Sequence, residues 1–144
     1  MAINASATYL DAIVTKYVGI SGIGSSGDYA GTPIPFTPKW QFAASTDYNW
    51  DMDGKNFFVG QTSTYNSHTF SVVGGDAISR LPSYYLLDLR AGVRFGDGQW
   101  SLMAYGHNVT NTFYWTNVTK GGSDTITRYT GMPATYGVTL SMRM

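Results

Sequence analysis

The chain has 144 residues, and only 12% of them are charged, about half the share that is usual in soluble domains. Positive and negative side chains balance to a formal net charge of zero, which gives no indication of nucleic acid or of another strongly charged partner. Cysteine is absent, so disulfide bonds and thiolate metal sites are excluded. Aromatic residues reach 15% and glycine occurs 17 times, a composition that favours strands over helices.

Apolar and polar side chains alternate along the first half of the chain with the period of two that is typical of half-exposed strands. Residues 3–18 form the first such segment, but Asp11 falls on its apolar side, so either a bulge near Leu10 or a membrane boundary near Asp11 is expected. In residues 39–50 the apolar face is Trp40, Phe42, Ala44, Thr46, Tyr48 and Trp50. Residues 57–65 form a third segment, which is only partly apolar on one side.

Three further segments follow in the second half. The apolar face of residues 85–95 consists of Tyr85, Leu87, Leu89, Ala91, Val93 and Phe95. Residues 100–105 alternate more weakly, because both of their faces are apolar. The last segment places on one side Tyr136, Val138, Leu140, Met142 and Met144. The pattern therefore predicts about six strands.

The connections between these segments alternate in length. Residues 52–54 and 96–98 contain Asp-Gly and predict tight hairpin turns. The stretches 20–37, 66–82 and 109–132 are long and polar. Short turns on one side and long loops on the other are typical of outer-membrane barrels, with the short turns in the periplasm and both chain ends on the short-turn side. The fold class predicted is all-β, a segment of an antiparallel up-and-down transmembrane β-barrel.

Aromatic residues on the apolar face gather at two levels. Trp50, Phe95 and Trp100 fall near the short turns. The residues expected near the long loops are Tyr17, Trp40, Tyr85 and Tyr136. The apolar band between them is Leu87, Leu89, Ala91, Leu102, Ala104 and Leu140. Two aromatic girdles that bracket an apolar band indicate a membrane barrel, because a soluble β-sandwich has no reason to sort its aromatics in this way.

Four stretches, in order, resemble the C-terminal barrel region of TonB-dependent outer-membrane receptors. Residues 37–40 (TPKW) resemble the family's "tPkw" entry into a strand, and residues 81–92 (LPSYYLLDLRAG) resemble its "iPsYtllDlraG" strand. Residues 108–111 (NVTN) together with Tyr114 are similar to "NltN..Y", and residues 131–140 (GMPATYGVTL) to the closing "g.PrtyGltl".

Two positions depart from that family pattern. Ala134 stands where the family commonly has Arg, and the chain ends in Met144 where the family usually ends in an aromatic residue. The first residues lack the basic and apolar regions of a signal peptide, and nothing in residues 1–144 resembles the plug or the TonB-contact segment. We therefore expect residues 1–144 to be a partial barrel, a fragment or truncated product of such a receptor.

The resemblance implies a location in the bacterial outer membrane, in contact with lipid. It also implies partners: the remaining barrel strands and plug of a full-length receptor, and TonB through an N-terminal part that this chain lacks. Copies of the chain itself are an alternative source of strands. The function implied is to form wall and extracellular loops for nutrient uptake of a siderophore, vitamin or saccharide, with no transport by the chain alone. Two other interpretations stay open: a soluble all-β, lectin-like ligand-binding module, and a small oligomeric outer-membrane pore.

Two sets of residues are candidates for a functional site. Charged residues on the polar side of the strands would face the barrel lumen: Lys39, Asp47, Asp88, Arg90, Arg94 and Arg143. They either pair across strands in a solvated wall or, as the resemblance implies, contact the plug and line the substrate path. The second set is the aromatic residues of the long loops: Tyr29, Phe70, Phe113, Tyr114, Trp115 and Tyr129. They either capture an extracellular ligand or pack the loops together.

Other motifs predict no chemistry. Residues 22–27 match G-x-G-x-x-G, but the next residues cannot open a helix, so we interpret them as a loop. His68 and His107 are the only histidines and have no ligand at metal spacing. No G-x-S-x-G or other triad context occurs. We therefore predict no catalytic residue, no metal and no cofactor, and a protein that is not an enzyme.

Overall fold

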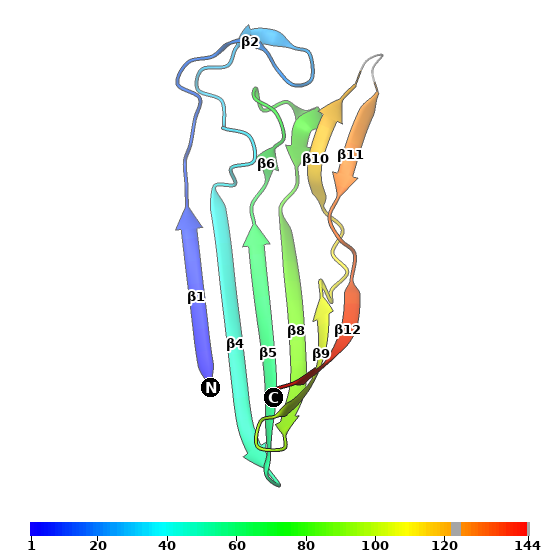
Figure 1. Ribbon diagram of the computed structural model, residues 1–144. Helices are drawn as coiled ribbons and strands as arrows, with labels where there is room; N and C mark the ends of the chain where they lie inside the picture. The colour runs from blue at the N-terminus through cyan, green and yellow to red at the C-terminus, as the bar shows by residue number, and fades with distance from the viewer. Residues whose placement is uncertain (122–124, 144) are drawn as a thin grey trace.

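The structure is a computed structural model that describes residues 1–121 and 125–143. Residues 122–124 of the third long loop and Met144, which we predicted to end the last strand, lie outside the described residues. Six long strands form one antiparallel sheet: β1 (Ala2–Tyr9), β4 (Trp40–Met52), β5 (Lys55–Asn66), β8 (Tyr84–Phe95), β9 (Trp100–His107) and β12 (Thr135–Met142). They lie side by side in chain order (Figure 1), which confirms the predicted up-and-down antiparallel fold.

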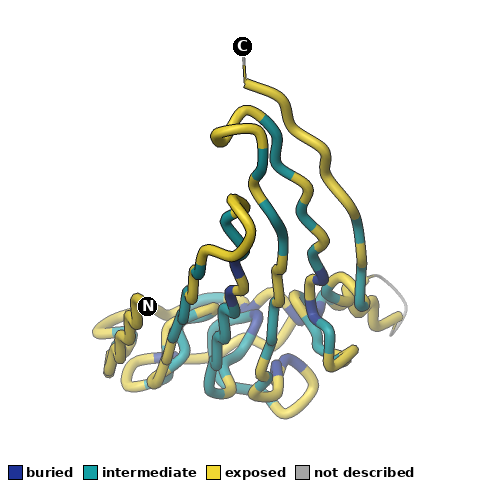
Figure 2. The backbone as a smooth tube through the Cα atoms, turned by 90° about the horizontal axis from the view of Figure 1, so that it is seen from below, coloured by how far each residue is buried: buried dark blue, intermediate teal, exposed yellow. Residues whose placement is uncertain are grey.

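The sheet is open. Its edge strands are β1 and β12, and within the described residues neither has a second neighbour. Both chain ends lie on the same side as the short turns, as predicted (Figure 1). Seen from below (Figure 2), the two ends stay well apart, so the six strands do not close into a barrel. Among the described residues, no helix has the length and hydrophobicity required to cross a bilayer.

The two short turns have the backbone that was predicted for them. Met52 pairs with Lys55, and between them Asp53 and Gly54 have φ values of 51° and 69°. Asp97 and Gly98 repeat this geometry in the second turn, with φ values of 54° and 84°. Positive φ at both central residues is the requirement of type I′ turns, whose twist matches that of the flanking strands, and Asp-Gly meets it with little strain.

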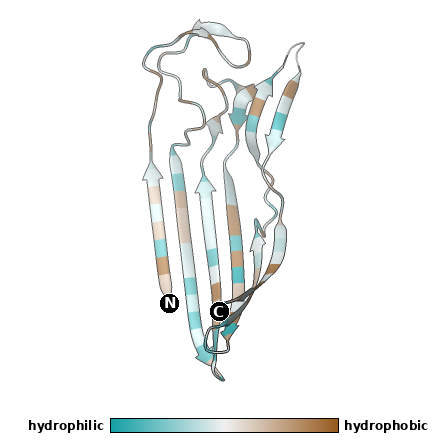
Figure 3. Cartoon of the chain, viewed as in Figure 1, coloured by the Kyte–Doolittle hydropathy of each residue, from teal (hydrophilic) through white to brown (hydrophobic). Residues whose placement is uncertain are grey.

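The pairing register confirms the predicted separation of side chains, and bands of opposite hydropathy alternate along the long strands (Figure 3). Directly paired residues share one face of a sheet. One row across the sheet, on what we term the apolar face, is Trp50, Phe57, Val93, Leu102 and Leu140. A row on the opposite, polar face is Asp47, Gly60, Arg90, Tyr105 and Gly137.

Aromatic pairs on the apolar face form two levels, as predicted, with one correction. Near the turns the ring centroids of Trp50 and Phe57 lie 5.6 Å apart. Near the loops those of Tyr9 and Trp40 lie 4.7 Å apart. The prediction that Tyr17 belongs to this upper level is wrong, because β1 ends at Tyr9 and the chain then enters the loops.

Strand β1 also settles the question raised by Asp11. All eight residues from Ala2 to Tyr9 pair with β4 without a register shift, so no bulge is present there. Asp11 lies beyond the end of the strand. The alternation fails at this position because the strand has already ended.

The long loops contain short elements of their own at the end of the sheet opposite the turns (Figure 1). They are the hairpin of β2 (Val18–Ile20) and β3 (Ser26–Asp28), the pair β6 (Thr69–Phe70) and β7 (Arg80–Leu81) with the 3₁₀ turn η1 (Ala77–Ser79), and the hairpin of β10 (Trp115–Lys120) and β11 (Ile126–Thr130). We term residues 10–39, 67–83 and 108–134 the loop cap.

Most of the buried side chains of the described residues lie in this loop cap rather than in the sheet. Val118 is fully buried, and with it are buried Ile23, Tyr29 and Leu81, and the polar Ser21, Ser71, Ser79 and Asn108. The hydroxyl of Ser71 donates a hydrogen bond of 2.7 Å to the carbonyl of Val118 and so joins the second loop to the third. In the described part of the six-stranded sheet, Phe58 is the one large hydrophobic residue that is buried.

Candidate functional site

The centre of the polar face carries an ion pair that spans three strands. Arg90 on β8 reaches across β5 and donates to the carboxylate of Asp47 on β4. Gly60 lies directly between them in the register. A Cβ atom at Gly60 would lie 2.6 Å from Asp47 Oδ1 and 2.7 Å from Arg90 Nε, so this contact across the strand depends on a missing side chain.

A second polar chain crosses the same strands nearer the turns. The amide of Asn56 donates to Asp51 over 2.8 Å, and Arg94 donates to the amide oxygen of Asn56 over 2.9 Å. The Arg94 guanidinium also lies 4.4 Å from the ring centroid of Phe58. A cation over an aromatic ring is stabilised by the ring quadrupole, so Phe58 and Asn56 both contribute to holding Arg94 in place.

A third group lies at the loop end of β8 and β9. Asp88 Oδ2 is 3.0 Å from His107 Nδ1, and Asp88 Oδ1 accepts a 2.8 Å hydrogen bond from the backbone N–H of Asn108. The hollow beside this pair has a volume of about 290 Å³. Its polar lining residues include Thr62, Asp88, Arg90, Tyr105 and His107. These groups can offer hydrogen bonds to whatever fills the concave side of the sheet.

The six predicted lumen-facing charges are thus divided. Asp47, Asp88, Arg90 and Arg94 lie on the polar face as expected, and Asp47 and Arg90 are joined. Lys39 precedes β4 and pairs instead with Asp11 at 2.7 Å, and the hydrogen bond and charge of that carboxylate raise the pKa of Lys39. Arg143 follows β12, and its backbone N–H donates to the carbonyl of Gln99 over 2.8 Å.

Sequence reasoning missed several residues of this face. His107, Asn56 and Gly60 were not predicted to take part, although each holds one of the charged residues in place. His107 falls on the same parity as Ser101, which lies on the polar face, so the alternation of residues 100–105 extended by one step would have found it. Gly60 offers no such signal, because its role appears only when the register is known.

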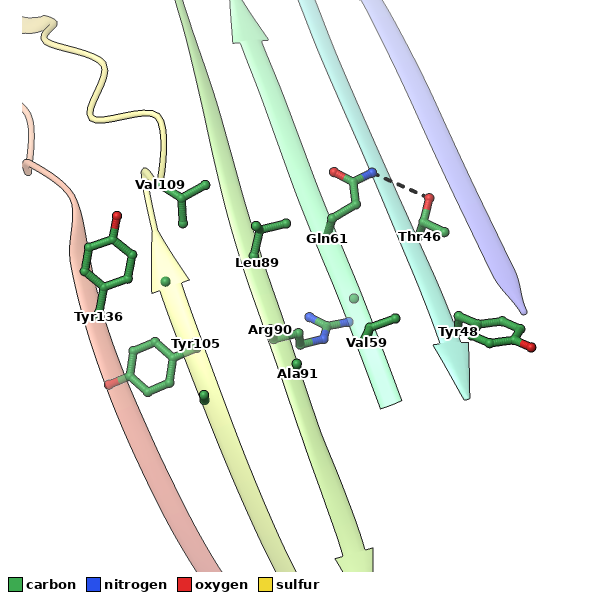
Figure 4. A pocket seen from close by; sticks show the side chains of 13 residues that line it. Thr46, Tyr48, Val59, Gln61, Leu89, Arg90, Ala91, Tyr105, Val109 and Tyr136 are labelled. Atoms are coloured by element: carbon green, nitrogen blue, oxygen red, sulfur yellow. Dashed lines mark hydrogen bonds between the residues drawn. The ribbon is translucent and has the colours of Figure 1, made fainter. Parts of the chain in front are cut away.

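The opposite, apolar face is hollowed at its centre (Figure 4). This depression has a volume of about 530 Å³ and lies over small residues, Ala91, Ala104 and Gly106, between larger side chains of neighbouring strands. Leu89 and Tyr136 border it toward the loops. Two of its lining residues are joined, because Gln61 Nε2 donates to Thr46 Oγ1 over 3.5 Å.

The predicted loop aromatics divide into packing residues and exposed residues. Tyr29 is buried against Tyr17, with ring centroids 5.9 Å apart. Tyr114 stacks on Tyr84 of β8 at 4.4 Å. Phe70 meets the His68 ring edge-on at 6.2 Å. These three residues make packing contacts, two within a single loop and one with a strand of the sheet.

The remaining three aromatics lie on or beside the β10–β11 hairpin. Phe113 and Tyr129 are 68% and 52% exposed. Trp115 lies between Phe113, whose ring is 4.9 Å away, and Arg128, whose guanidinium is 5.5 Å away. This cluster keeps aromatic surface and a cation accessible at the outer end of the molecule.

Asn108 closes the base of the third loop. Its side-chain amide donates to the carbonyls of Thr112 and Met132, both over 3.0 Å, and its oxygen accepts from Thr112 N–H. Asn111 accepts from the N–H of Ala134 at 3.0 Å. Both asparagines have positive φ, 49° and 50°, which asparagine tolerates better than most residues. The motif at 108–111 is therefore a structural clasp that joins the start of the loop to its return.

Within the described residues, no three His or Asp side chains gather closely enough to hold a metal ion.

Comparison with models of known protein families identifies the family of this sheet. A model described as "TonB dependent receptor-like, beta-barrel" matches residues 1–109. The chain belongs to this family. The family is one of outer-membrane receptors and transporters rather than an enzyme class. The matched region confirms the resemblance at residues 37–40 and 81–92, whereas residues 131–140 lie beyond it.

A solved structure shows the same fold. The crystal structure of the ferric yersiniabactin uptake receptor FyuA from Yersinia pestis matches with a TM-score of 0.70 and 19% sequence identity. The match covers 83% of this chain and 18% of that receptor, so the chain spans less than a fifth of its length. Full-length TonB-dependent receptors combine such a barrel with a plug and interact with TonB. A comparison with curated protein sequences finds no match.

Proposed function

We propose that the chain forms wall and extracellular loops of an outer-membrane TonB-dependent transporter for uptake of a nutrient such as a siderophore, a vitamin or a saccharide. The observation that carries this proposal is that the rows of the apolar face expose large side chains, on a sheet of this family. Leu89, Leu102 and Leu140 are 45%, 43% and 61% exposed. A soluble lectin-like sandwich would bury such a row, whereas a membrane barrel turns it toward lipid.

The open edges imply that the chain works only together with other strands. In lipid, each backbone N–H or C=O without a partner costs several kcal/mol. Strands β1 and β12 each have eight residues and one neighbour in the described sheet. The summed cost is on the order of tens of kcal/mol, more than side-chain contacts can offset. We therefore propose that remaining barrel strands cover both edges and that this chain alone does not transport.

The two candidate sets of residues then have proposed roles. The polar face turns toward the lumen, where its hydrogen-bonding groups contact the plug or line the path of the nutrient. Phe113, Trp115 and Tyr129 are the loop aromatics that remain available to a ligand from outside the cell. The plug-bearing part of a longer receptor would contact TonB. The structural relative is named for uptake of ferric yersiniabactin, which supports an uptake role without fixing the nutrient.

Cysteine labelling tests the proposed topology. The chain has no cysteine, so single substitutions can be labelled against a clean background. In intact Gram-negative cells that export the chain, Phe113→Cys should react with a membrane-impermeant maleimide, because Phe113 is exposed in the loop cap. Asp53→Cys, in a short turn, should react only after the outer membrane is permeabilised.

The unsubstituted chain is the control for this labelling. The proposal fails if Asp53→Cys is labelled from outside and Phe113→Cys is not. It also fails if the chain purifies without detergent as a soluble monomer that unfolds cooperatively. An oligomeric pore built from copies would instead give the expected labelling together with conductance in planar bilayers.

Growth tests the uptake role. Cells lacking the gene should lose growth when one class of nutrient, a ferric siderophore, a vitamin or an oligosaccharide, is limiting. The class on which growth is lost identifies the nutrient. Unchanged growth on all three classes, with the topology confirmed, would refute nutrient uptake but not the barrel.

A further inference from the structure

We propose that Tyr105 and Tyr136 form a two-sided clamp that sets the register of the edge strand β12 against β9. The two residues occupy adjacent positions of the ladder, and each is paired with a glycine of the other strand: Tyr105 with Gly137, and Tyr136 with Gly106. Successive residues of a strand point to opposite faces. The clamp therefore holds the same two rungs from the polar face and from the apolar face at once.

Each ring fills the space that a side chain on the opposite glycine would occupy. A Cβ atom at Gly137 would lie 2.5 Å from Cζ of Tyr105. A Cβ atom at Gly106 would lie 2.8 Å from Cδ1 of Tyr136, and 2.7 Å from Cγ1 of Val109, which borders the same space. Each ring reaches toward the neighbouring strand (Figure 4). An aromatic ring that covers a glycine of the adjacent strand restores the packing that glycine lacks and shields its backbone.

The clamp distinguishes registers that the alternation of side chains does not. A slip by one residue turns every side chain to the wrong face and is already excluded. A slip by two residues keeps the faces, and it would pair Tyr105 with Thr139 or Thr135 instead of Gly137. Both alternatives are β-branched, so the ring would meet a side chain where it now covers bare backbone.

The rest of β12 gives little protection against such a slip. Val138 faces Ala104 and Leu140 faces Leu102 in the observed register. After a two-residue slip Leu140 would face Ala104, which is again an apolar pair on the lipid side. Within the described sheet β9 is the one neighbour of β12, so the contacts between these two strands have to set the register there. The asparagine clasp fixes where the loop returns, whereas the clamp acts on the strand itself.

Cross-linking of cysteine pairs in the full chain, in the outer membranes of Gram-negative cells that export it, measures the register directly. Met103→Cys with Thr139→Cys reports the observed register, because these residues are paired on the polar face. Met103→Cys with Ser141→Cys reports a slip in one direction, and Ser101→Cys with Thr139→Cys a slip in the other. In the otherwise unchanged chain, the first pair should cross-link several-fold more than either slip pair.

Removing both rings tests the clamp. In the background Tyr105→Ala with Tyr136→Ala, the ratio of slip to native cross-links should rise at least several-fold. Tyr136→Phe keeps a ring over Gly106 and should leave the ratio unchanged. Tyr85→Ala is the matched control, because Tyr85 is an exposed aromatic of the same face that is paired with Tyr65 and not with glycine. An unchanged ratio in the double variant overturns the proposal, as does an equal rise with Tyr85→Ala.

If the double variant does not assemble, the single variants decide. Tyr105→Ala should raise the slip ratio and Tyr105→Phe should not, and equal behaviour of the two refutes the clamp. The outcome is separate from the proposed function, because the labelling of loop and turn cysteines reports membrane topology whether or not β12 keeps its register.

Discussion

The sheet and the loop cap are stabilised in different ways. In the sheet, most of the side chains remain accessible on both faces, and large leucines such as Leu89 are nearly half exposed. In the loop cap, Val118 and Ser79 are completely buried and segments far apart in sequence are joined by hydrogen bonds. A sheet that faces lipid on one side and water on the other needs no core of its own within one layer, because its surroundings complete it. A cap exposed to water needs one.

The largest difference in stability is expected between two variants that place the same charge on opposite faces of one strand. Leu89→Arg puts a guanidinium on the apolar face near mid-bilayer, where the cost is about 2–4 kcal/mol. Leu86→Arg is the matched control, because Leu86 lies on the polar face of the same strand, paired with Thr64. Urea unfolding in outer-membrane vesicles from cells that export the chain should show a large loss of unfolding free energy for the first variant and a small loss for the second. Equal losses would contradict the assignment of the faces.

Gly92→Ala should be the next most damaging change, and it lies on the polar face. A Cβ atom there would lie 2.5 Å from the backbone oxygen of Leu102 and 2.8 Å from a ring carbon of Phe58. Because backbone cannot move aside, overpacking should cost about 1–3 kcal/mol. Gly60→Ala is the comparison, since the atoms nearest to its Cβ belong to the side chains of Asp47 and Arg90 and not to the backbone. The same unfolding assay should rank Gly92→Ala as the more destabilising variant, and the reverse order would contradict this packing.

Much of the sheet could be predicted from the sequence because its determinants are local. Alternation assigns faces from each strand alone, and Asp-Gly fixes the turns at 53–54 and 97–98. Alternation does not fix the register between strands. The contact of Arg90 with Asp47 over Gly60 was therefore out of reach, although each of the two charged residues was placed on the correct face.

The loop cap was harder to predict for a related reason. Whether a loop aromatic packs or stays accessible depends on segments distant in the chain. Tyr29 and Phe113 look alike in sequence, yet one is buried and the other is 68% exposed. Tyr17 was assigned to the sheet because the end of β1 carries no stop signal other than Asp11. Contacts between such distant segments produce no periodic pattern in the sequence, so they could not be predicted from it.

The same substitution at one valine of the loop cap and at one valine of the sheet compares how the two regions are stabilised. Val118→Ala removes two buried methyl groups from the loop cap and should cost about 2 kcal/mol, since a buried methylene is worth about 0.8 kcal/mol before any cavity cost is added. Val138→Ala is the same change on the apolar face of β12, where Val138 is 71% exposed and should lose little. Hydrogen exchange should show faster opening of the cap in the first variant only. Faster exchange of the sheet in that variant would mean that the two regions unfold as one unit.

The smallest effect is expected at the junction of the two regions, where Asp11 follows β1 and Lys39 precedes β4. The hydrogen bond and charge of Asp11 raise the pKa of Lys39 above its usual 10.5. A raised pKa means that the pair stabilises the folded chain below that value, and that the contribution is lost as pH rises through the folded pKa. Both side chains are about half exposed, at 55% and 49%, so solvent screening keeps the contribution small. Asp11→Asn should therefore lower the urea midpoint slightly at neutral pH, and the difference from the parent should vanish well above pH 10.5. A difference that persists there would show that Asp11 acts through packing at the junction and not through its charge on Lys39.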